Sequence, residues 1–431
     1  MRIRTGKPMN RKTFLTRALA GATAVSLSPF GSLRAGVVSD ESTLQGLSAL
    51  DLTDWSHVRE LFPLTHDRVY FNTGGLGPPS YPVLEAMRDQ ALRQATTGET
   101  HHSLFAEVRA TTARFFGANP KEIAFNRNAS EGNSIIAAGL DLKRGDEVIF
   151  DSHAHPGGSF PWMVRQKEEG IRVRIFEPDS RRPETNLERI LDLVNERTRV
   201  IQVSHITAPT GILFDAEAIA GEARKRGIWF HIDGAQSAGM IPLDLHQSGC
   251  DSFAASGHKW LNAPQETGFL YIAEDRLADV ASSHAGAYSD AGYDLPDQFS
   301  YNPAAQRHEY GTRDAASLVG LERALLLQEH IGRERIAAHG KDLAGKARQR
   351  LAEIRGLEIL TPEHPAMHNS ILTFRFKNRD ARKMAGALSN THGLRCRHVS
   401  ERDLNAVRVS WHVYHQEADV EHLEAGIRAL A

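Results

Sequence analysis

The feature that most limits the fold of this chain is a long alternation of strand-like and helix-like segments. Amphipathic stretches such as 187–196 and 216–226 have helical spacing and separate short apolar runs. The runs expected to be strands are 122–126, 146–150, 172–178, 199–206, 228–235, 252–258 and 268–274. Strands that alternate with helices predict an α/β fold, in which a mostly parallel central sheet has helices on both faces. Ligand-binding groups are then expected in the loops beyond the carboxyl ends of the strands.

The pattern changes after Asp314, where a long helical stretch begins and runs to about Ile331, with more helix to Ile354. Short strands and helices follow, which predicts a smaller C-terminal α+β domain. A length of 431 residues suits two or three domains. The expected organisation is an N-terminal segment over 36–65, a large cofactor-binding domain over 66–325 and a small domain over 326–431.

The first 35 residues differ from the rest. A basic start is followed by an apolar run, 18–27, that is too short to span a bilayer and fits the core of an export signal. The string NRKTFL is similar to a twin-arginine signal, with Lys12 in place of the second arginine. We expect export to the periplasm without stable membrane association after processing. The alternative is a cytoplasmic protein with a leader.

Composition narrows the possible partners. Hydrophobic residues make up 41% of the chain, charged residues make up 24%, and the formal net charge is −2. This balance gives no reason to expect nucleic acid as a partner. The two cysteines, Cys250 and Cys396, lack metal-type spacing and form no disulfide framework, so we expect no metal and two buried or partly buried thiols.

A single acid and a single lysine carry the strongest chemical signal. Asp233 ends an apolar run, and Lys259 lies 26 residues later in a turn of small residues. Pyridoxal phosphate needs a lysine amine for its Schiff base and a carboxylate at its pyridinium nitrogen. Lysine in a region poor in charge is expected to have a lowered pKa, as an imine-forming amine requires. Taken separately, the two residues would be read as a turn aspartate and a surface lysine.

Several loop residues are candidates to bind the cofactor. The loop 126–133 between a strand and a helix offers the amides of Ala129 and Ser130 at a helix N-terminus, which favours phosphate. The polar residues Ser256 and His258 flank the lysine, and Thr312 is a further candidate phosphate donor, to its own or to a neighbouring subunit. For each of these, ordinary helix capping or backbone bonding is the alternative.

Two more positions complete the expected cofactor site, and a third is expected to bind substrate. Gln236 is a donor to the ring hydroxyl. His155 is expected to stack on the pyridine ring, with His153 as a competitor for that role. Arg408 lies in an apolar, alternating strand, and its planar guanidinium suits an amino-acid carboxylate. A structural ion pair within the small domain, or a solvent-facing strand position, is the alternative for Arg408.

These motifs together resemble class V aminotransferase-fold pyridoxal phosphate enzymes, and most of all isopenicillin N epimerase-like proteins. The resemblance covers roughly residues 65 to 420 and rests on NTGGLGP, NRNASEGN, SHAHP, SHITAPTG, HIDGAQSAG, SGHKWL, RHEYGTRD and VRVSWHVYH. It implies fold type I architecture, a homodimer with active sites at the subunit interface, and Lys259 as the Schiff base lysine. Ala208 stands where the family has an asparagine, so the contact to the ring oxygen is expected from Thr210, Gln236 or both.

The expected function is a pyridoxal-phosphate-dependent reaction on an amino acid or amino-acid derivative. Lys259 would remove the Cα proton, and epimerisation or transamination would follow. A lyase that cleaves a C–S or C–C bond is the alternative. Desulfurase chemistry by a persulfide is disfavoured, since the loop 398–405 has no cysteine. A non-catalytic exported binding protein is a remote alternative.

Overall fold

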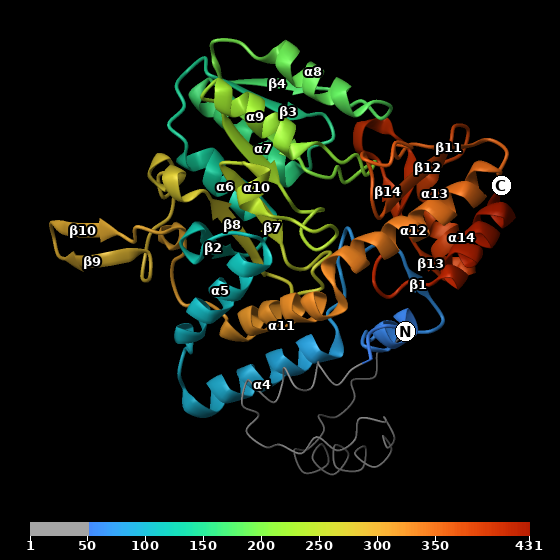
Figure 1. The fold of residues 1–431 in the computed structure, drawn as a ribbon, viewed down its shortest axis with the longest axis horizontal. Helices are drawn as coiled ribbons and strands as arrows, with labels where there is room; N and C mark the ends of the chain where they lie inside the picture. Colours follow the sequence, from blue (N-terminus) through green and yellow to red (C-terminus); the bar gives the residue numbers. More distant parts are fainter. Residues whose placement is uncertain (1–50) are drawn as a thin grey trace, which may run out of the picture. The chain divides into compact units, whose positions relative to one another are not determined.

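The computed structural model describes residues 51–431, so the predicted export signal lies outside the described part. A seven-stranded sheet with the order β2-β8-β7-β6-β5-β3-β4 forms the larger unit (Figure 1). The strands are β2 (Ile123–Asn126), β3 (Glu147–Asp151), β4 (Arg172–Phe176), β5 (Thr198–Ser204), β6 (Trp229–Asp233), β7 (Ser252–Ser256) and β8 (Gly268–Ile272). Strand β8 is antiparallel to both of its neighbours, β2 and β7, and the other neighbouring strands of this sheet are parallel. The predicted α/β class with a mostly parallel sheet is confirmed.

Helices cover both faces of this sheet, as predicted. Successive residues of β3 point to opposite faces: Val148 and Phe150 pack with α6 and α7, whereas Ile149 packs in the cluster that includes α5, α9 and α11. Burying each large apolar side chain stabilises the fold by roughly 1.5–3 kcal/mol. The helices of this unit are α4 (Tyr81–Thr97), α5 (Phe105–Phe115), α6 (Ala129–Gly139), α7 (Pro156–Glu169), α8 (Pro183–Leu193), α9 (Ala216–Lys225), α10 (Leu245–Ser248) and α11 (Ala315–Ile331).

Polar side chains end the strands at one edge of the large sheet. Asp151, Ser204, Asp233 and Ser256 are the last residues of β3, β5, β6 and β7. The parallel register pairs Ser204 with Asp233, so these ends meet side by side. The sheet thus gathers buried polar groups at its carboxyl edge, where a ligand site is expected.

A four-stranded antiparallel sheet, β11-β12-β15-β14, forms the smaller unit. Its strands are β11 (Leu357–Ile359), β12 (Ile371–Phe376), β14 (Arg397–Val399) and β15 (Ala406–Ser410), with helices α12 (Arg333–Ala352), α13 (Ala381–His392) and α14 (Glu417–Leu430). The short strand β1 (Val69–Tyr70) pairs with β13 (Leu394–Arg395), and Phe71 is buried in the same core as Phe374 and Trp411. Residues 69–71 therefore pack with the smaller unit, although they precede the large sheet in the chain.

The chain passes from the larger unit to the smaller one at Gly332, between α11 and α12. Helix α11 packs along α4 and α5 of the larger unit (Figure 1). It runs past residue 325, where the sequence suggested a domain limit, because its apolar residues are buried against those helices. No helix among residues 51–431 is long and apolar enough to cross a bilayer.

Two peripheral elements complete the described fold. Helix α3 (Trp55–Glu60) lies in the expected N-terminal segment, 36–65, and buries Val58. The hairpin of β9 (Asp290–Asp294) and β10 (Gln298–Tyr301) projects from the larger unit (Figure 1). This hairpin was not predicted from the sequence, because its strands are exposed and therefore lack an apolar alternation.

Candidate active site

Asp233 and Lys259 lie at the carboxyl ends of neighbouring strands. Asp233 ends β6, Lys259 follows β7, and the parallel register pairs Asp233 with Ala254. The negative charge of Asp233 acts on the Lys259 amine. The sheet therefore brings together the acid and the lysine that the sequence singled out.

The environment of Lys259 lowers the pKa of its amine to about 8. Burial is the largest cause, and the positive charges of Arg408 and Arg397 act in the same direction, while Asp233 opposes them. Removing a cation from water disfavours its charged form, and nearby like charges add to this effect. The amine is therefore partly neutral near physiological pH, as nucleophilic and basic lysines require.

A directed series of hydrogen bonds holds the Asp233 carboxylate. Oδ2 accepts from Asn133 Nδ2 at 3.0 Å and Oδ1 accepts from the backbone N–H of Ala235 at 3.0 Å. Asn133 Oδ1 in turn lies 2.8 Å from His231 Nε2, and His231 Nδ1 lies 2.8 Å from Ser252 Oγ. Because a carboxylate only accepts, Asn133 presents its oxygen to His231, which must donate from Nε2. Sequence reasoning missed Asn133 and His231.

The N-terminus of α6 and the residue before the lysine turn form a compact polar cradle. The backbone N–H of Ala129 donates to Ser256 Oγ at 3.0 Å. Gly157 leaves room beside Ser130, since a Cβ on Gly157 would lie 2.1 Å from Ser130 Oγ. Asn128, not Ser130, caps the helix, so the exposed Ser130 hydroxyl does not serve as the cap. An amide-rich helix N-terminus beside the Ser130 and Ser256 hydroxyls suits a phosphate.

His258 lies between the cradle and Lys259. Burial, and then the charge of Lys259, lower the pKa of its imidazole to about 4. The ring is therefore neutral and can donate one hydrogen bond to a phosphate oxygen. The backbone oxygen of His258 accepts from Gly77 N at 2.7 Å, which packs the glycine-rich segment against the lysine turn.

His155 and His153 have different surroundings. His155 caps α7, with Nδ1 accepting from Gly157 N at 3.1 Å, so its Nε2 carries the proton. Although His155 as a residue is exposed, packing around its ring and the charge of Lys259 lower its pKa, and Asp233 opposes this. The buried His153 is directed to Thr210 instead, at 3.0 Å from Oγ1. The ring near both Lys259 and Asp233 is thus that of His155.

Gln236 and Thr210, the two residues expected to contact the ring oxygen of the cofactor, already form hydrogen bonds within the protein. Gln236 donates from Nε2 to Gly74 O at 2.9 Å and accepts from Trp260 Nε1 at 2.8 Å. Thr210 Oγ1 lies 2.9 Å from Thr207 Oγ1. Gln236 has a second amide hydrogen left to donate. Thr312 is exposed, and within residues 51–431 no hydrogen bond joins its hydroxyl to Ala129 or Ser256.

Two arginines of the smaller unit lie in adjacent strands. Arg408 of β15 is buried and directly opposite Arg397 of β14. Arg408 donates to Ala208 O at 2.9 Å and to Asn72 Oδ1 at 3.2 Å. Burial, with the charge of Arg397, lowers its pKa to about 9. Sequence reasoning missed Arg397, which begins β14 directly after the buried Cys396.

The residues fit pyridoxal phosphate. Two buried arginine nitrogens, Arg408 Nε and Arg397 Nη1, have no hydrogen-bond partner within residues 51–431, which leaves donors for an anionic substrate. Asp233 suits the pyridinium nitrogen of the cofactor, and Lys259 suits the Schiff base at the other end of the ring. The cradle at Ala129 and Ser256 suits the phosphate. Fold and site together define a pyridoxal-phosphate-dependent enzyme with the fold type I architecture.

Comparisons with known proteins place this enzyme in a family. Residues 83–423 match the family model described as Aminotransferase class-V, and the chain belongs to that family. It is 28% identical to an isopenicillin N epimerase of Amycolatopsis lactamdurans, over 88% of this chain and 99% of the relative. It is 30% identical to a probable cysteine desulfurase of Methanothermobacter thermautotrophicus, over 87% of this chain and 97% of the relative.

Solved structures agree on the fold. An apo cysteine desulfurase from Thermococcus onnurineus superposes with a TM-score of 0.78 at 25% identity. The superposition covers 86% of this chain and 97% of that protein. The predicted family, fold and cofactor are therefore confirmed, whereas the relatives carry out more than one reaction.

Proposed function

We propose that this enzyme transfers a proton at the Cα atom of an amino acid or amino-acid derivative, as an epimerase does. The proposal rests on Lys259, whose amine has a pKa of about 8. The carboxylate of Asp233, which Asn133 holds in place, and the guanidinium groups of Arg397 and Arg408 surround this amine with charge. The likeness to an isopenicillin N epimerase along most of both chains supports it. Transamination is the second outcome open to the same residues.

Each residue has a distinct task in this reaction. Bound pyridoxal phosphate supplies an electron sink that acidifies the substrate's Cα–H bond. Lys259 takes that proton as general base, because its lowered pKa leaves the amine partly neutral. Arg397 and Arg408 bind the substrate carboxylate, and Asp233 holds a proton at the pyridine nitrogen. His155, whose pKa is lowered by burial and by the charge of Lys259, would pack its neutral ring against the pyridine.

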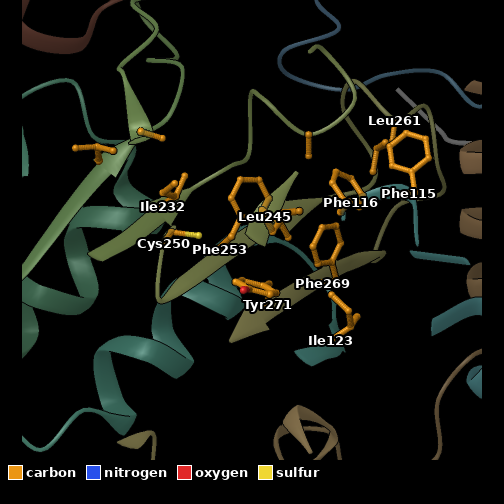
Figure 2. Close-up of a cluster of buried hydrophobic side chains, with 14 of the residues drawn as sticks. Phe115, Phe116, Ile123, Ile232, Leu245, Cys250, Phe253, Leu261, Phe269 and Tyr271 are labelled. Atoms are coloured by element: carbon orange, nitrogen blue, oxygen red, sulfur yellow. The ribbon is translucent and has the colours of Figure 1, made fainter. Parts of the chain in front are cut away.

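Neither cysteine suits persulfide chemistry. Cys250 lies within the hydrophobic cluster that contains Phe253 and Tyr271 (Figure 2). Cys396 is fully buried in the smaller unit's core. Burial raises the pKa of each thiol to about 12, so neither forms a thiolate at neutral pH. This supports chemistry at Cα without an enzyme thiol.

Isotope exchange tests the proposal. Holoenzyme is incubated in deuterium oxide with a panel of amino acids, and deuterium at Cα, optical configuration and keto acids are measured. Deuterium uptake with inversion supports the epimerase, and keto acid formation supports the transaminase. Loss of exchange in Lys259→Ala, with the double variant Cys250→Ala/Cys396→Ala still active, would identify the lysine as the base. Exchange that requires either cysteine would contradict the proposal.

A second candidate function is cleavage of a C–S bond without an enzyme thiol. The 30% identity with a probable cysteine desulfurase favours it. Incubation with cysteine, cystine and cystathionine, followed by assays for pyruvate, ammonia and sulfide, separates this lyase from an epimerase. Stoichiometric pyruvate would favour the lyase.

We also propose that the enzyme acts as a homodimer. The exposed position of Thr312 supports this, since its hydroxyl is free to reach a phosphate bound in another subunit. Light scattering combined with cofactor titration of Thr312→Ala tests it. A monomer with full cofactor affinity would contradict the proposal.

A further inference from the structure

Arg397 and Glu401 form an ion pair at the start of the loop 400–405. Arg397 Nη2 donates to Glu401 Oε1, and Glu401 Oε2 accepts from the backbone N–H of Ser400 at 3.1 Å. The two side chains are 27% and 30% exposed, so water screens their charges only in part. The carboxylate is therefore fixed beside the guanidinium.

The other terminal nitrogen of Arg397 remains unused. Nη1 is buried and has no hydrogen-bond partner within residues 51–431. A buried donor without an acceptor is costly, and a substrate carboxylate would supply the missing acceptor. One guanidinium would then hold Glu401 on one nitrogen and the substrate on the other.

Glu401 is linked to the reaction site through Arg397, which lies directly opposite Arg408 in the sheet. The charge of Arg397 reaches Lys259. The charge of Glu401 acts on Arg408 and on His155, in both cases against the lowering of the pKa that burial causes. Arg402, the next residue, lies 3.7 Å from Glu177, which follows β4, so the loop joins the smaller unit to the larger one.

We propose that Glu401 is a specificity-determining residue that favours amino acids with a neutral or cationic side chain over those with a second carboxylate. A second substrate carboxylate would share a half-buried site with Glu401, where two like charges repel each other. A neutral side chain avoids this repulsion, and an ammonium group is attracted. The inference rests on the proposed function, because it takes an amino acid as the substrate.

Equilibrium binding to the holoenzyme tests this inference. Visible absorption of the bound cofactor is titrated with glutamine, glutamate and lysine, each in both configurations. Glutamine and glutamate have nearly the same shape, so the ratio of their dissociation constants measures the effect of the side-chain charge alone. We expect wild-type enzyme to bind glutamine and lysine about tenfold more tightly than glutamate, as for a partly screened charge pair.

Variants separate the charge of Glu401 from its packing. Glu401→Gln should bring the glutamine-to-glutamate ratio close to one, whereas Glu401→Asp should keep the preference. Glu358→Gln is the matched control, because Glu358 pairs with Arg375 at 2.9 Å in the same sheet, and it should leave the ratio unchanged.

Two results would overturn this inference and leave the proposed function intact. One is a wild-type enzyme that binds glutamate as tightly as glutamine, which needs no variant to fold. The other is an unchanged ratio in Glu401→Gln. If no amino acid altered the spectrum of wild-type holoenzyme, the proposed function itself would fail, and the inference with it.

Discussion

The Asn133 amide donates a hydrogen bond to Asp233 Oδ2 across 3.0 Å, and it is itself oriented by His231. Burial lowers the pKa of His231 to about 4, so the ring is neutral at working pH. Ser252 Oγ accepts from Trp229 Nε1 at 2.9 Å and is thus left to donate to His231 Nδ1. The donors thus point in one direction, from Ser252 through His231 and Asn133 to the Asp233 carboxylate.

Asn133→Ala should remove the hydrogen bond that holds the Asp233 carboxylate in place for the pyridine nitrogen of the cofactor. Loss of a buried hydrogen bond to a charged group costs about 1.5–3 kcal/mol. We expect weaker cofactor binding and a shift in the pH titration of the cofactor's visible absorption. Ser134→Ala is the control, since the Ser134 hydroxyl donates to the Ser130 carbonyl one turn away on the same helix. An unchanged titration in Asn133→Ala would show that the asparagine has a purely structural role.

Ser256→Ala should weaken the binding of phosphate specifically. The substitution removes the hydroxyl that accepts from Ala129 N and that lies next to the phosphate cradle. We expect the dissociation constant for pyridoxal phosphate to rise about tenfold, which corresponds to about 1.4 kcal/mol. Binding of pyridoxal, which lacks the phosphate, should not change. Equal losses for both compounds would place Ser256 outside the phosphate site.

Gly77→Ala should displace the lysine turn. A Cβ at Gly77 would lie 1.8 Å from the Lys259 carbonyl oxygen, a backbone atom that cannot move alone. Overpacking of this kind costs about 1–3 kcal/mol, and covalent attachment of the cofactor should decrease with it. Urea unfolding and borohydride trapping measure the two effects. Gly221→Ala, on helix α9 with open space around it, should instead stabilise the fold by up to about 1 kcal/mol.

The rate at which apoenzyme takes up cofactor should rise with pH and level off above about 8. Only the neutral Lys259 amine attacks the cofactor aldehyde, and its pKa is about 8. Arg397→Gln removes a positive charge and should move this midpoint to higher pH. Asp233→Asn removes the opposing negative charge and should move it to lower pH. Stopped-flow absorption over pH 6–10 measures the midpoints, and a shift of either variant in the other direction would refute the assignment.

Acid should destabilise the fold through buried histidines. His412 Nε2 lies 2.6 Å from Asn262 Oδ1, and burial lowers the pKa of His412 to about 3. The unfolded chain binds a proton below its pKa of about 6.5, so this contribution to stability is fully present above that pH and is lost as pH falls toward 3. The slope is at most about 1.4 kcal/mol per pH unit for one histidine.

Urea unfolding between pH 7 and pH 4 measures this dependence. His412→Gln should flatten the slope, because glutamine does not titrate. The exposed His422 serves as a control, and His422→Gln should leave the slope as in the wild type. A wild-type stability that does not change over this range would contradict the prediction.

The sequence by itself determined the sheet, the cofactor and the pairing of Asp233 with Lys259. Strand alternation is a local signal, and consecutive parallel strands usually lie side by side, so the ends of β6 and β7 had to meet. The loop that contains Ala129 was likewise recognisable, because a strand, a polar turn and a helix follow one another directly in the chain.

Only the tertiary structure decided which distant side chains complete the site. Asn133 and Asp233 are 100 residues apart, and the orientation of the amide between them depends on His231. The position of Arg397 opposite Arg408, with one nitrogen on Glu401 and the other free, depends on the register of two antiparallel strands. Periodicity shows that a residue is buried, but hydrogen-bond partners are set by three-dimensional packing, which no local pattern encodes.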